Sequence, residues 1–152
     1  MKAYVAEAFG PPESLVLKDV TPGDLTLGNV RLNVRAAGAS LLDALIAGVN
    51  NCELDPEDSS VGYGGLPNAE GVVQLDSCCM HGPTKRAGGV AGIEGVRAPS
   101  LVAKAVMENT DHHLLVGKGA QDFARNMGFK IEDDLNTEHS RQMWLEWKRR
   151  ID

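Results

Sequence analysis

The sequence contains few aromatic residues and few cysteines. Only 5% of its 152 residues are Phe, Trp or Tyr, so a folded core must consist largely of Val, Leu, Ile and Ala. The cysteines are Cys52, Cys78 and Cys79, an odd number without a Cys-x-x-Cys spacing. Such a set does not supply the ligands of a structural zinc site. We therefore predict reduced thiols in a cytoplasmic protein, with no metal and no metal-binding residues.

The sequence also lacks a broad basic surface and a long apolar run. The net charge is −6, and basic residues cluster only at Lys148, Arg149 and Arg150. Because nucleic-acid binding needs more clustered Lys and Arg than this, no nucleic-acid partner is expected. No apolar run approaches the roughly 18 residues of a membrane span. The N-terminus carries Lys2 and Glu7 and lacks the apolar stretch of a signal peptide. We expect no membrane partner.

Residues 1–38 are expected to form β-strands. Apolar runs at 3–6 and 15–20 are separated by a Gly-Pro-Pro break, and residues 30–35 alternate between apolar and polar, as in a half-buried strand. Three stretches carry a family likeness: Met1-Lys2-Ala3, Phe9-Gly10-Pro11-Pro12-Glu13 and Val30-Arg31-Leu32-Asn33-Val34-Arg35-Ala36-Ala37-Gly38. Over these stretches the segment resembles the start of the GroES-like β-barrel in the quinone-oxidoreductase branch of the medium-chain dehydrogenases.

A short helix is expected over residues 40–48. Ser40 can cap its N-terminus, and Gly48 is expected to end it. The segment 50–59 that follows is polar and acidic, with Asp55, Glu57 and Asp58. It lacks the central glycine and terminal glutamate of a calcium-binding loop, so we predict a solvated loop.

The most distinctive stretch is rich in glycine and runs from Ser59 to Gly95. It includes Ser60-Val61-Gly62-Tyr63-Gly64-Gly65, where glycine permits positive φ and close approach of the backbone. One strand is predicted to include Val72, Val73 and Leu75, and a second to run from Gly88 to Ile93. The neighbouring Cys78 and Cys79 would point to opposite faces of such a strand.

The last third of the sequence predicts helices. Pro99 suits the first turn of one helix, and an amphipathic helix is expected over 119–127, ended by Gly128 in a Schellman turn. Between them, residues 112–116 are expected to form a buried strand, with one of His112 and His113 exposed and the other inside. A final helix within 135–151 is expected to follow the N-cap Thr137. Its predicted core-facing stripe is Met143, Trp144, Trp147 and Ile151.

Several motifs over residues 40–150 occur in an order that carries a second family likeness. They are Ser60-Val61-Gly62-Tyr63-Gly64-Gly65, Leu75-Asp76 with Met80-His81-Gly82-Pro83-Thr84, Gly88-Gly89-Val90-Ala91-Gly92, and Leu114-Leu115-Val116-Gly117. This region resembles the α-subunit of the glycosylasparaginases, N-terminal-nucleophile hydrolases that cleave the amide between asparagine and N-acetylglucosamine. The resemblance implies an α+β fold, part of an αββα sandwich, and no cofactor. It also implies a glycosylated asparagine as the substrate, a threonine-led β-subunit as a partner, and a homo- or hetero-oligomer.

The same resemblance implies a substrate-binding role for Ser60, which in the family helps to position the nucleophile. Asp76 and Thr84 also match motif positions, and we expect them to have structural roles. The family makes its threonine nucleophile by cleaving an Asp–Thr bond, and the sequence contains no Asp-Thr dipeptide. We therefore expect an incomplete asparaginase-type amidohydrolase chain, with no catalytic residue of its own and inactive alone.

Together the two resemblances predict a chimera, oxidoreductase-like over 1–38 and glycosylasparaginase-like over 39–152. The alternative is an N-terminal fragment of an NADPH-dependent, zinc-free quinone oxidoreductase. A dinucleotide-binding turn of the form Gly-x-Gly-x-x-Gly would support it. The sequence offers only Gly117-Lys118-Gly119 without the third glycine, which favours the asparaginase interpretation.

Overall fold

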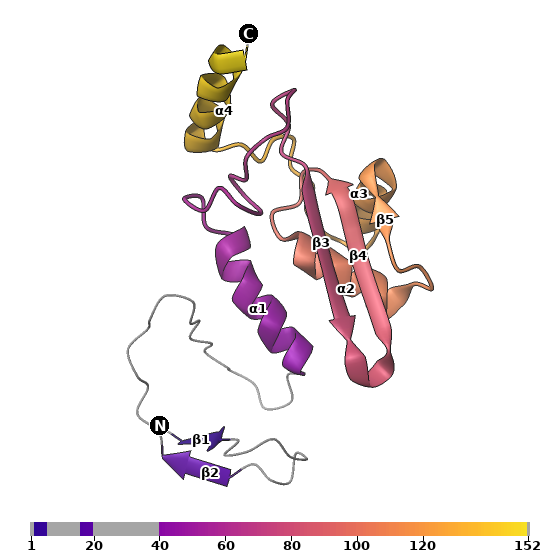
Figure 1. The fold of residues 1–152 in the computed structure, drawn as a ribbon. Helices are drawn as coiled ribbons and strands as arrows, with labels where there is room; N and C mark the ends of the chain where they lie inside the picture. The colour runs from indigo at the N-terminus through magenta and orange to yellow at the C-terminus, as the bar shows by residue number, and fades with distance from the viewer. Residues whose placement is uncertain (1, 6–15, 20–39, 152) are drawn as a thin grey trace. The chain divides into compact units, whose positions relative to one another are not determined.

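The computed structural model describes residues 2–5, 16–19 and 40–151. The chain divides into two compact units, Met1–Arg31 and Leu32–Asp152, and each is described by itself (Figure 1). In the first unit, strand β1 (Lys2–Val5) pairs antiparallel with β2 (Val16–Asp19), as the apolar runs predict. Such a pair does not identify a GroES-like barrel. The strand predicted at 30–35 and the boundary predicted at 38–39 lie outside the described residues.

The second unit contains a three-stranded sheet in the order β3-β4-β5. Strands β3 (Leu75–His81) and β4 (Arg86–Ile93) form an antiparallel hairpin, and β5 (Leu115–Val116) pairs parallel to β4. The hairpin turns through a short 3₁₀ segment, Gly82–Thr84. The predicted α+β class is therefore confirmed at the level of a small mixed sheet with helices.

The strand predicted from Val72 begins later than expected, at Leu75. Val72 belongs to a loop that closes on Asn68: its N–H donates to Asn68 Oδ1 at 3.1 Å, and its carbonyl accepts from the Asn68 N–H at 2.8 Å. These local bonds use the backbone groups that a strand would present to its neighbour. Val73 is nevertheless buried, so the loop contributes this apolar side chain to the core without strand pairing.

Within residues 40–151, four α-helices accompany this sheet: α1 (Leu41–Glu53), α2 (Pro99–Asn109), α3 (Gly117–Asn126) and α4 (Glu138–Ile151). Three predicted end signals are confirmed. Ser40 caps α1, with its Oγ accepting from the Asp43 N–H at 3.1 Å. Pro99 is the first residue of α2. Gly128 ends α3 at φ 87°, where the Phe129 N–H reaches back to the Ala124 carbonyl at 3.0 Å in a Schellman turn.

Gly48 does not end α1, contrary to the sequence prediction. The helix continues to Glu53, whose side chain is buried. A glycine inside a helix costs about 1 kcal/mol relative to alanine. The hydrogen bonds that the Glu53 carboxylate accepts from Asn50 and Ser100 offset this cost.

The core of the second unit lies between the sheet and the helices α2 and α3. It consists of Val73, Leu75, Val90, Ile93, Val96, Val102, Val106, Ala120, Ala124 and Leu135. A smaller cluster of Leu42, Ile46 and Met107, with Cys79 against it, holds α1 to α2 and to β3. The cores are therefore aliphatic, as the shortage of aromatic residues predicts.

Helix α2 covers one face of the sheet, which lies in front of it in Figure 1. Gly88 of β4 faces this helix so closely that an added Cβ would lie 2.3 Å from the Ala103 carbonyl oxygen. Side chains alternate along a strand, so Cys78 and Met80 of β3 point to the other face, and both are exposed. Cys79 packs against the buried cluster, which confirms the opposite orientations predicted for Cys78 and Cys79.

Two predictions of burial in the last third of the chain were wrong. His112 and His113 are both exposed, and only Leu115–Val116 of the predicted strand is a strand, where it lies at the edge of the sheet. In α4 the predicted apolar stripe does not form a core, because only part of it is covered where the helix lies beside the loop before β3. Trp144 lies on Gly71 with ring atoms 3.3 Å from where a Cβ would be, while Trp147 and Ile151 are exposed.

Candidate functional site

Ser60, the residue predicted to bind substrate, lies in an exposed turn that follows α1. Its backbone N–H donates to Asp58 Oδ1 at 2.9 Å, and its hydroxyl donates to the same oxygen. The Ser60 hydroxyl, followed by the Ser60 N–H, holds the pKa of Asp58 below its usual value. The hydroxyl is thus held in one orientation on an accessible surface, where a ligand could reach it.

The glycine-rich segment after Ser60 is fixed by backbone hydrogen bonds to two distant parts of the chain. The Tyr63 N–H donates to the carbonyl of Glu53 at 2.8 Å, and the Gly64 N–H donates to the carbonyl of Leu135 at 2.9 Å. Gly62 has φ +64°, and a Cβ there would lie 2.1 Å from the Glu53 carbonyl oxygen. No side chain fits at this position, which explains the glycine that the sequence places there.

Glu53 is the most buried charged residue of the described chain, with 2% of its surface exposed. Its carboxylate accepts from the Ser100 N–H at 3.0 Å, from the Ser100 hydroxyl at 2.7 Å and from Asn50 Nδ2 at 2.6 Å. The N-cap residue of α2, Ala98, has no side-chain cap of its own. Glu53 therefore caps α2 from another helix, and its negative charge lies at the positive end of the helix dipole.

The guanidinium of Arg97 lies over the ring face of Tyr63, the aromatic residue of the motif. The guanidinium carbon lies 3.8 Å from the ring centroid, a cation–π contact. Arg97 also forms a two-point ion pair with Glu132, with Nε–Oε1 at 2.7 Å and Nη2–Oε2 at 2.9 Å. The hydrogen bonds from Arg97 are the main cause of a lowered pKa of Glu132, and Lys130 lowers it further. The same ion pair raises the pKa of Arg97.

Asp76 and Thr84 each have local partners of the kind that a structural role requires. Asp76 Oδ1 accepts from the Gly92 N–H at 2.7 Å, across the β3–β4 pair. Thr84 Oγ1 lies 2.8 Å from His81 Nδ1 inside the hairpin turn. None of these hydrogen bonds involves Ser60.

The sequence reasoning did not identify Glu53, Arg97 or Glu132. Each acts through a partner far along the chain: Glu53 meets Ser100 at a separation of 47 residues, and Arg97 meets Glu132 at 35. A local pattern cannot show such a pairing. For Glu53, the available signal was its place at the end of an apolar helix face. The whole acidic segment 50–59 was instead predicted to be a solvated loop.

An open groove of about 410 Å³ separates α4 from the loop before β3. Its lining is Leu66, Pro67, Asn68, Ala69, Met143, Trp144, Trp147 and Arg150. Ser60 is not among these residues, so the groove and the predicted substrate contact are separate places on this unit.

Two kinds of feature are absent from the described residues, 2–5, 16–19 and 40–151. None of the helices there is long and apolar enough to cross a membrane. No group of three or more His, Cys, Asp or Glu side chains there is arranged to hold a metal ion.

Comparison with known proteins gives a consistent result. A family model described as asparaginase matches residues 28–151. An N(4)-(beta-N-acetylglucosaminyl)-L-asparaginase from Elizabethkingia miricola is 46% identical over 114 residues, 75% of this chain and 33% of the relative. A plant-type L-asparaginase from Pyrococcus abyssi is 46% identical over 112 residues, 74% of this chain and 36% of the relative. A putative N(4)-(beta-N-acetylglucosaminyl)-L-asparaginase from Drosophila persimilis is 41% identical over 117 residues, 76% and 30%.

The chain thus spans about a third of the length of the curated relatives that it matches. The family match begins at residue 28, inside the segment with the oxidoreductase likeness, and a join between two families stays a prediction. These matches give no support to the alternative of an oxidoreductase fragment. Since the family match covers most of the sequence, this chain belongs to the asparaginase family and is similar to the glycosylasparaginases.

Proposed function

We propose that this chain is the α-region of an amidohydrolase that cleaves the side-chain amide of asparagine. The observation that carries the proposal is the 46% identity, over 114 and 112 residues, to two relatives that are both named as asparaginases. The held geometry of the Ser60–Gly65 loop adds support, because a substrate contact needs a fixed hydroxyl on an accessible surface.

The resemblance to the family supplies the proposed chemistry. The hydroxyl of a threonine at the N-terminus of a second region attacks the amide carbonyl, and the freed α-amine of that threonine takes the proton. The nitrogen of the substrate amide takes up that proton and leaves as an amine. Water then hydrolyses the ester on the threonine, which releases aspartate and restores the threonine hydroxyl. The sequence contains no Asp-Thr dipeptide, so the proposal includes inactivity of this chain alone and the need for a threonine-led partner region. The role of Ser60 is to position substrate and nucleophile.

The substrate proposed is an asparagine that carries N-acetylglucosamine on its side chain. Sequence similarity does not separate this substrate from free asparagine, because the glycosylasparaginase-named and the plant-type relatives are equally similar, at 46%. The leaving group is a glycosylamine in the first case and ammonia in the second. A reducing, cytoplasmic location is part of the proposal and is supported by three free cysteines.

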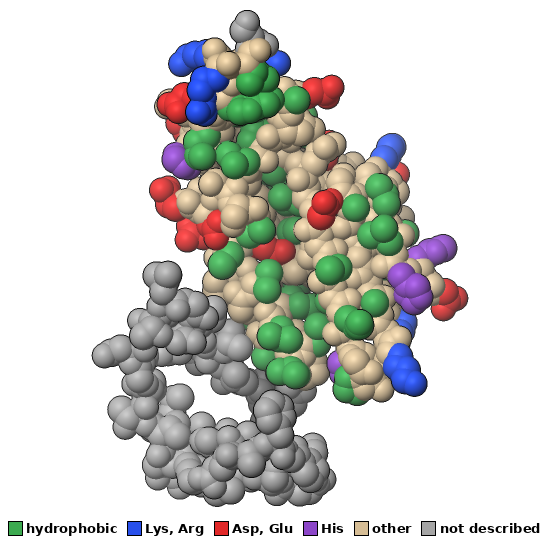
Figure 2. Space-filling model, in the orientation of Figure 1, with side chains coloured by type: hydrophobic (Ala, Val, Ile, Leu, Met, Phe, Trp, Pro, Cys, Tyr) green, Lys and Arg blue, Asp and Glu red, His purple; other side chains and the backbone are tan. Residues whose placement is uncertain are grey.

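The finer fold proposal is that this unit is half of an αββα sandwich. The uncovered face of the sheet supports it. Met80 is 68% exposed and Val116 is 60% exposed, and hydrophobic side chains lie over β3 and β4 on the side that faces the viewer in Figure 2. Exposed apolar surface of this kind is typical of a face that another layer covers. We propose that the threonine-led region supplies a second sheet there.

The function is tested by release of aspartate. The 152-residue chain is assayed alone and after mixing or co-expression with the threonine-led region of the Elizabethkingia relative, with free asparagine and with N-acetylglucosaminyl-asparagine as substrates. We expect no hydrolysis alone and hydrolysis of the glycosylated substrate by the pair. Activity of the chain alone would overturn the requirement for a partner. An inactive pair that co-purifies as a stable complex would overturn the amidohydrolase assignment.

A Ser60→Ala variant tests the one site residue. In the active pair we expect kcat/KM to fall about tenfold or more, the effect of one lost hydrogen bond to the reacting groups. Ser59→Ala is the matched control, because only the backbone carbonyl of Ser59 holds the loop, accepting from the Leu66 N–H at 2.9 Å. Equal kinetics for the two variants would remove Ser60 from the site.

A further inference from the structure

Glu53 is a buried acid whose neighbours satisfy it with hydrogen bonds and not with a positive charge. Within the described part of the chain, no Lys, Arg or His forms an ion pair with it; its carboxylate instead has three donors on Asn50 and Ser100. Burying an ionised carboxylate is costly unless such bonds compensate it. A Gln or Leu would occupy similar space at lower cost, so the presence of the acid needs a reason.

The side-chain carboxylate and the backbone carbonyl of Glu53 contact two different parts of the molecule. Its carboxylate is bonded to the first turn of α2 through Ser100. Its backbone carbonyl accepts from the Tyr63 N–H at 2.8 Å and lies where a Cβ of Gly62 would be, at 2.1 Å. The position of this carbonyl, and with it the start of the glycine-rich loop, therefore depends on how the carboxylate is held.

We propose that Glu53 is the positioning residue of the Ser60–Gly65 loop. By anchoring the last turn of α1 to the N-terminus of α2, its carboxylate fixes the carbonyl on which the loop closes. If the carboxylate loses one acceptor oxygen, the last turn of α1 shifts, the bond to Tyr63 lengthens, and the turn that holds Ser60 loosens. This inference rests on the proposed function for its consequence in catalysis, but not for its structural part.

The structural part is tested on the chain itself by hydrogen–deuterium exchange. Glu53→Gln places an amide NH₂ opposite donors on Asn50, where the carboxylate accepted a bond at 2.6 Å. We expect the Tyr63 amide to exchange about tenfold faster, the effect of about 1.4 kcal/mol in local opening. The amides of the central strand β4, such as that of Val90, should keep their exchange rates. Acceleration of all amides by one factor, or none at Tyr63, would overturn the proposal.

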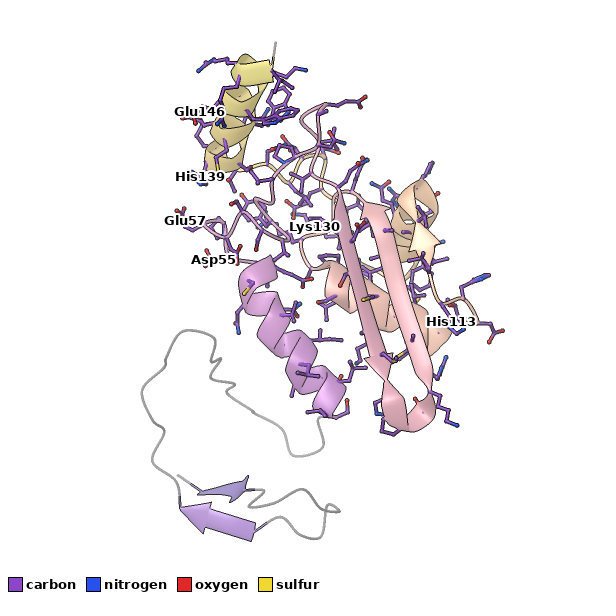
Figure 3. The ribbon with its side chains drawn as sticks, in the orientation of Figure 1. Asp55, Glu57, His113, Lys130, His139 and Glu146 are labelled. Atoms are coloured by element: carbon purple, nitrogen blue, oxygen red, sulfur yellow. The ribbon has the colours of Figure 1, made fainter. Side chains whose placement is uncertain are left out.

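Three further variants keep the test decisive. Glu57→Gln removes an acid from the same segment whose side chain points outward in Figure 3, so it should leave the exchange of Tyr63 unchanged. In the double variant Glu53→Gln with Asn50→Asp, the new amide at position 53 donates and the new carboxylate at position 50 accepts. We therefore expect slow exchange at Tyr63 to be restored. If Glu53→Gln does not fold, Ser100→Ala replaces it. This variant removes the hydroxyl that donates to Glu53 at 2.7 Å and accepts from Asn50 Nδ2 at 2.9 Å, but it keeps the backbone donor of Ser100. Unchanged exchange at Tyr63 in Ser100→Ala would then count against the proposal.

The catalytic part is measured in the pair with the threonine-led region. Here Glu53→Gln is expected to raise KM several-fold with a smaller change in kcat, because a loosened substrate loop weakens binding more than it alters the nucleophile. The double variant should recover most of the loss. If the pair is inactive while Tyr63 still responds, the proposed function fails and the positioning of the loop stands. If the pair is active and Glu53→Gln changes neither Tyr63 exchange nor KM, the positioning role fails and the function stands.

Discussion

At the scale of single residues, several close contacts between distant segments are made at glycines, where there is no side chain. Gly62 admits the carbonyl of Glu53, Gly71 admits the ring of Trp144, and Gly88 admits the backbone of α2. The sequence indicates that these positions are unusual but not which neighbour requires them. The neighbour comes from the tertiary fold, which brings together segments distant in the chain.

Gly88→Ala is predicted to destabilise the protein. The new Cβ would lie 2.3 Å from the Ala103 oxygen and 2.4 Å from the Met107 nitrogen, so α2 has to move off the sheet. Overpacking of this kind costs about 1–3 kcal/mol, which exceeds the gain of about 0.4–1 kcal/mol from a less flexible unfolded chain. Urea denaturation should show the loss.

The control for this variant is Gly82→Ala in the hairpin turn, because nothing lies within 4 Å of its added Cβ. It should change the free energy of unfolding by no more than about 0.5 kcal/mol. Equal stability of the two variants would show that α2 does not press on β4 as closely as the structure has it.

At the scale of helices and strands, α1 is attached to α2 at both of its ends. Glu53 holds the C-terminal end, and at the N-terminal end Lys104 Nζ lies 2.6 Å from Asp43 Oδ1. Asp43 also completes the capping box of α1 by accepting from the Ser40 N–H at 3.0 Å. Together Lys104, by its hydrogen bond, and Ser40 lower the pKa of Asp43 from 3.8 to about 2.

We predict that Lys104→Met raises the pKa of Asp43 from about 2 toward 3.8, since Lys104 is the largest cause of the shift. A carboxyl whose pKa is lowered on folding favours the folded state above its unfolded pKa, and this contribution disappears as the pH falls through the folded pKa. The link should therefore act fully above about pH 4 and vanish toward pH 2. An NMR titration of the Asp43 carboxyl carbon measures it.

Lys118→Met provides the comparison, because Lys118 pairs with Asp122 in α3 at 2.8 Å and not with Asp43. It should raise the pKa of Asp122 and leave the Asp43 titration where it was. An Asp43 midpoint that stays near 2 in Lys104→Met would mean that the capping box alone sets it.

The elements also show which signals in the sequence were sufficient. Ser40, Pro99 and Gly128 were predicted correctly because a cap or a Schellman turn uses atoms within a few residues. Gly48 was misjudged because a buried contact five residues later, to Ser100, decides where α1 ends. His112 and His113 were misjudged because an apolar run beside them indicates a strand but not whether anything covers it.

At the scale of the whole unit Leu32–Asp152, the described residues leave two apolar surfaces uncovered besides the groove beside α4. One is the outer face of the sheet with Met80 and Val116, and the other is a stripe on α1 formed by Leu41, Leu45 and Val49. Apolar residues four apart on a helix lie on one side of it, so this stripe is continuous. Under the proposed function, the outer face of the sheet is the surface on which the threonine-led region would pack.

Chemical labelling of the three free cysteines measures whether the outer face of the sheet is accessible. Cys52 is exposed on α1, Cys78 is exposed on the outer face of β3, and Cys79 faces the buried cluster. Burial raises the pKa of Cys79 and so lowers the fraction of reactive thiolate. In the chain alone we predict that a thiol reagent labels Cys52 and Cys78 at least about tenfold faster than Cys79.

The same labelling tests the proposed second sheet. In the active pair with the threonine-led region, Cys78 should become protected because another layer lies over β3, while Cys52 keeps its rate as an internal reference. Mass spectrometry of the labelled peptides distinguishes the sites. Protection of Cys78 without activity would place a partner on this face but separate docking from catalysis. Full labelling of Cys78 in an active pair would show that the catalytic region docks elsewhere, and the open stripe on α1 would then be the surface to test next.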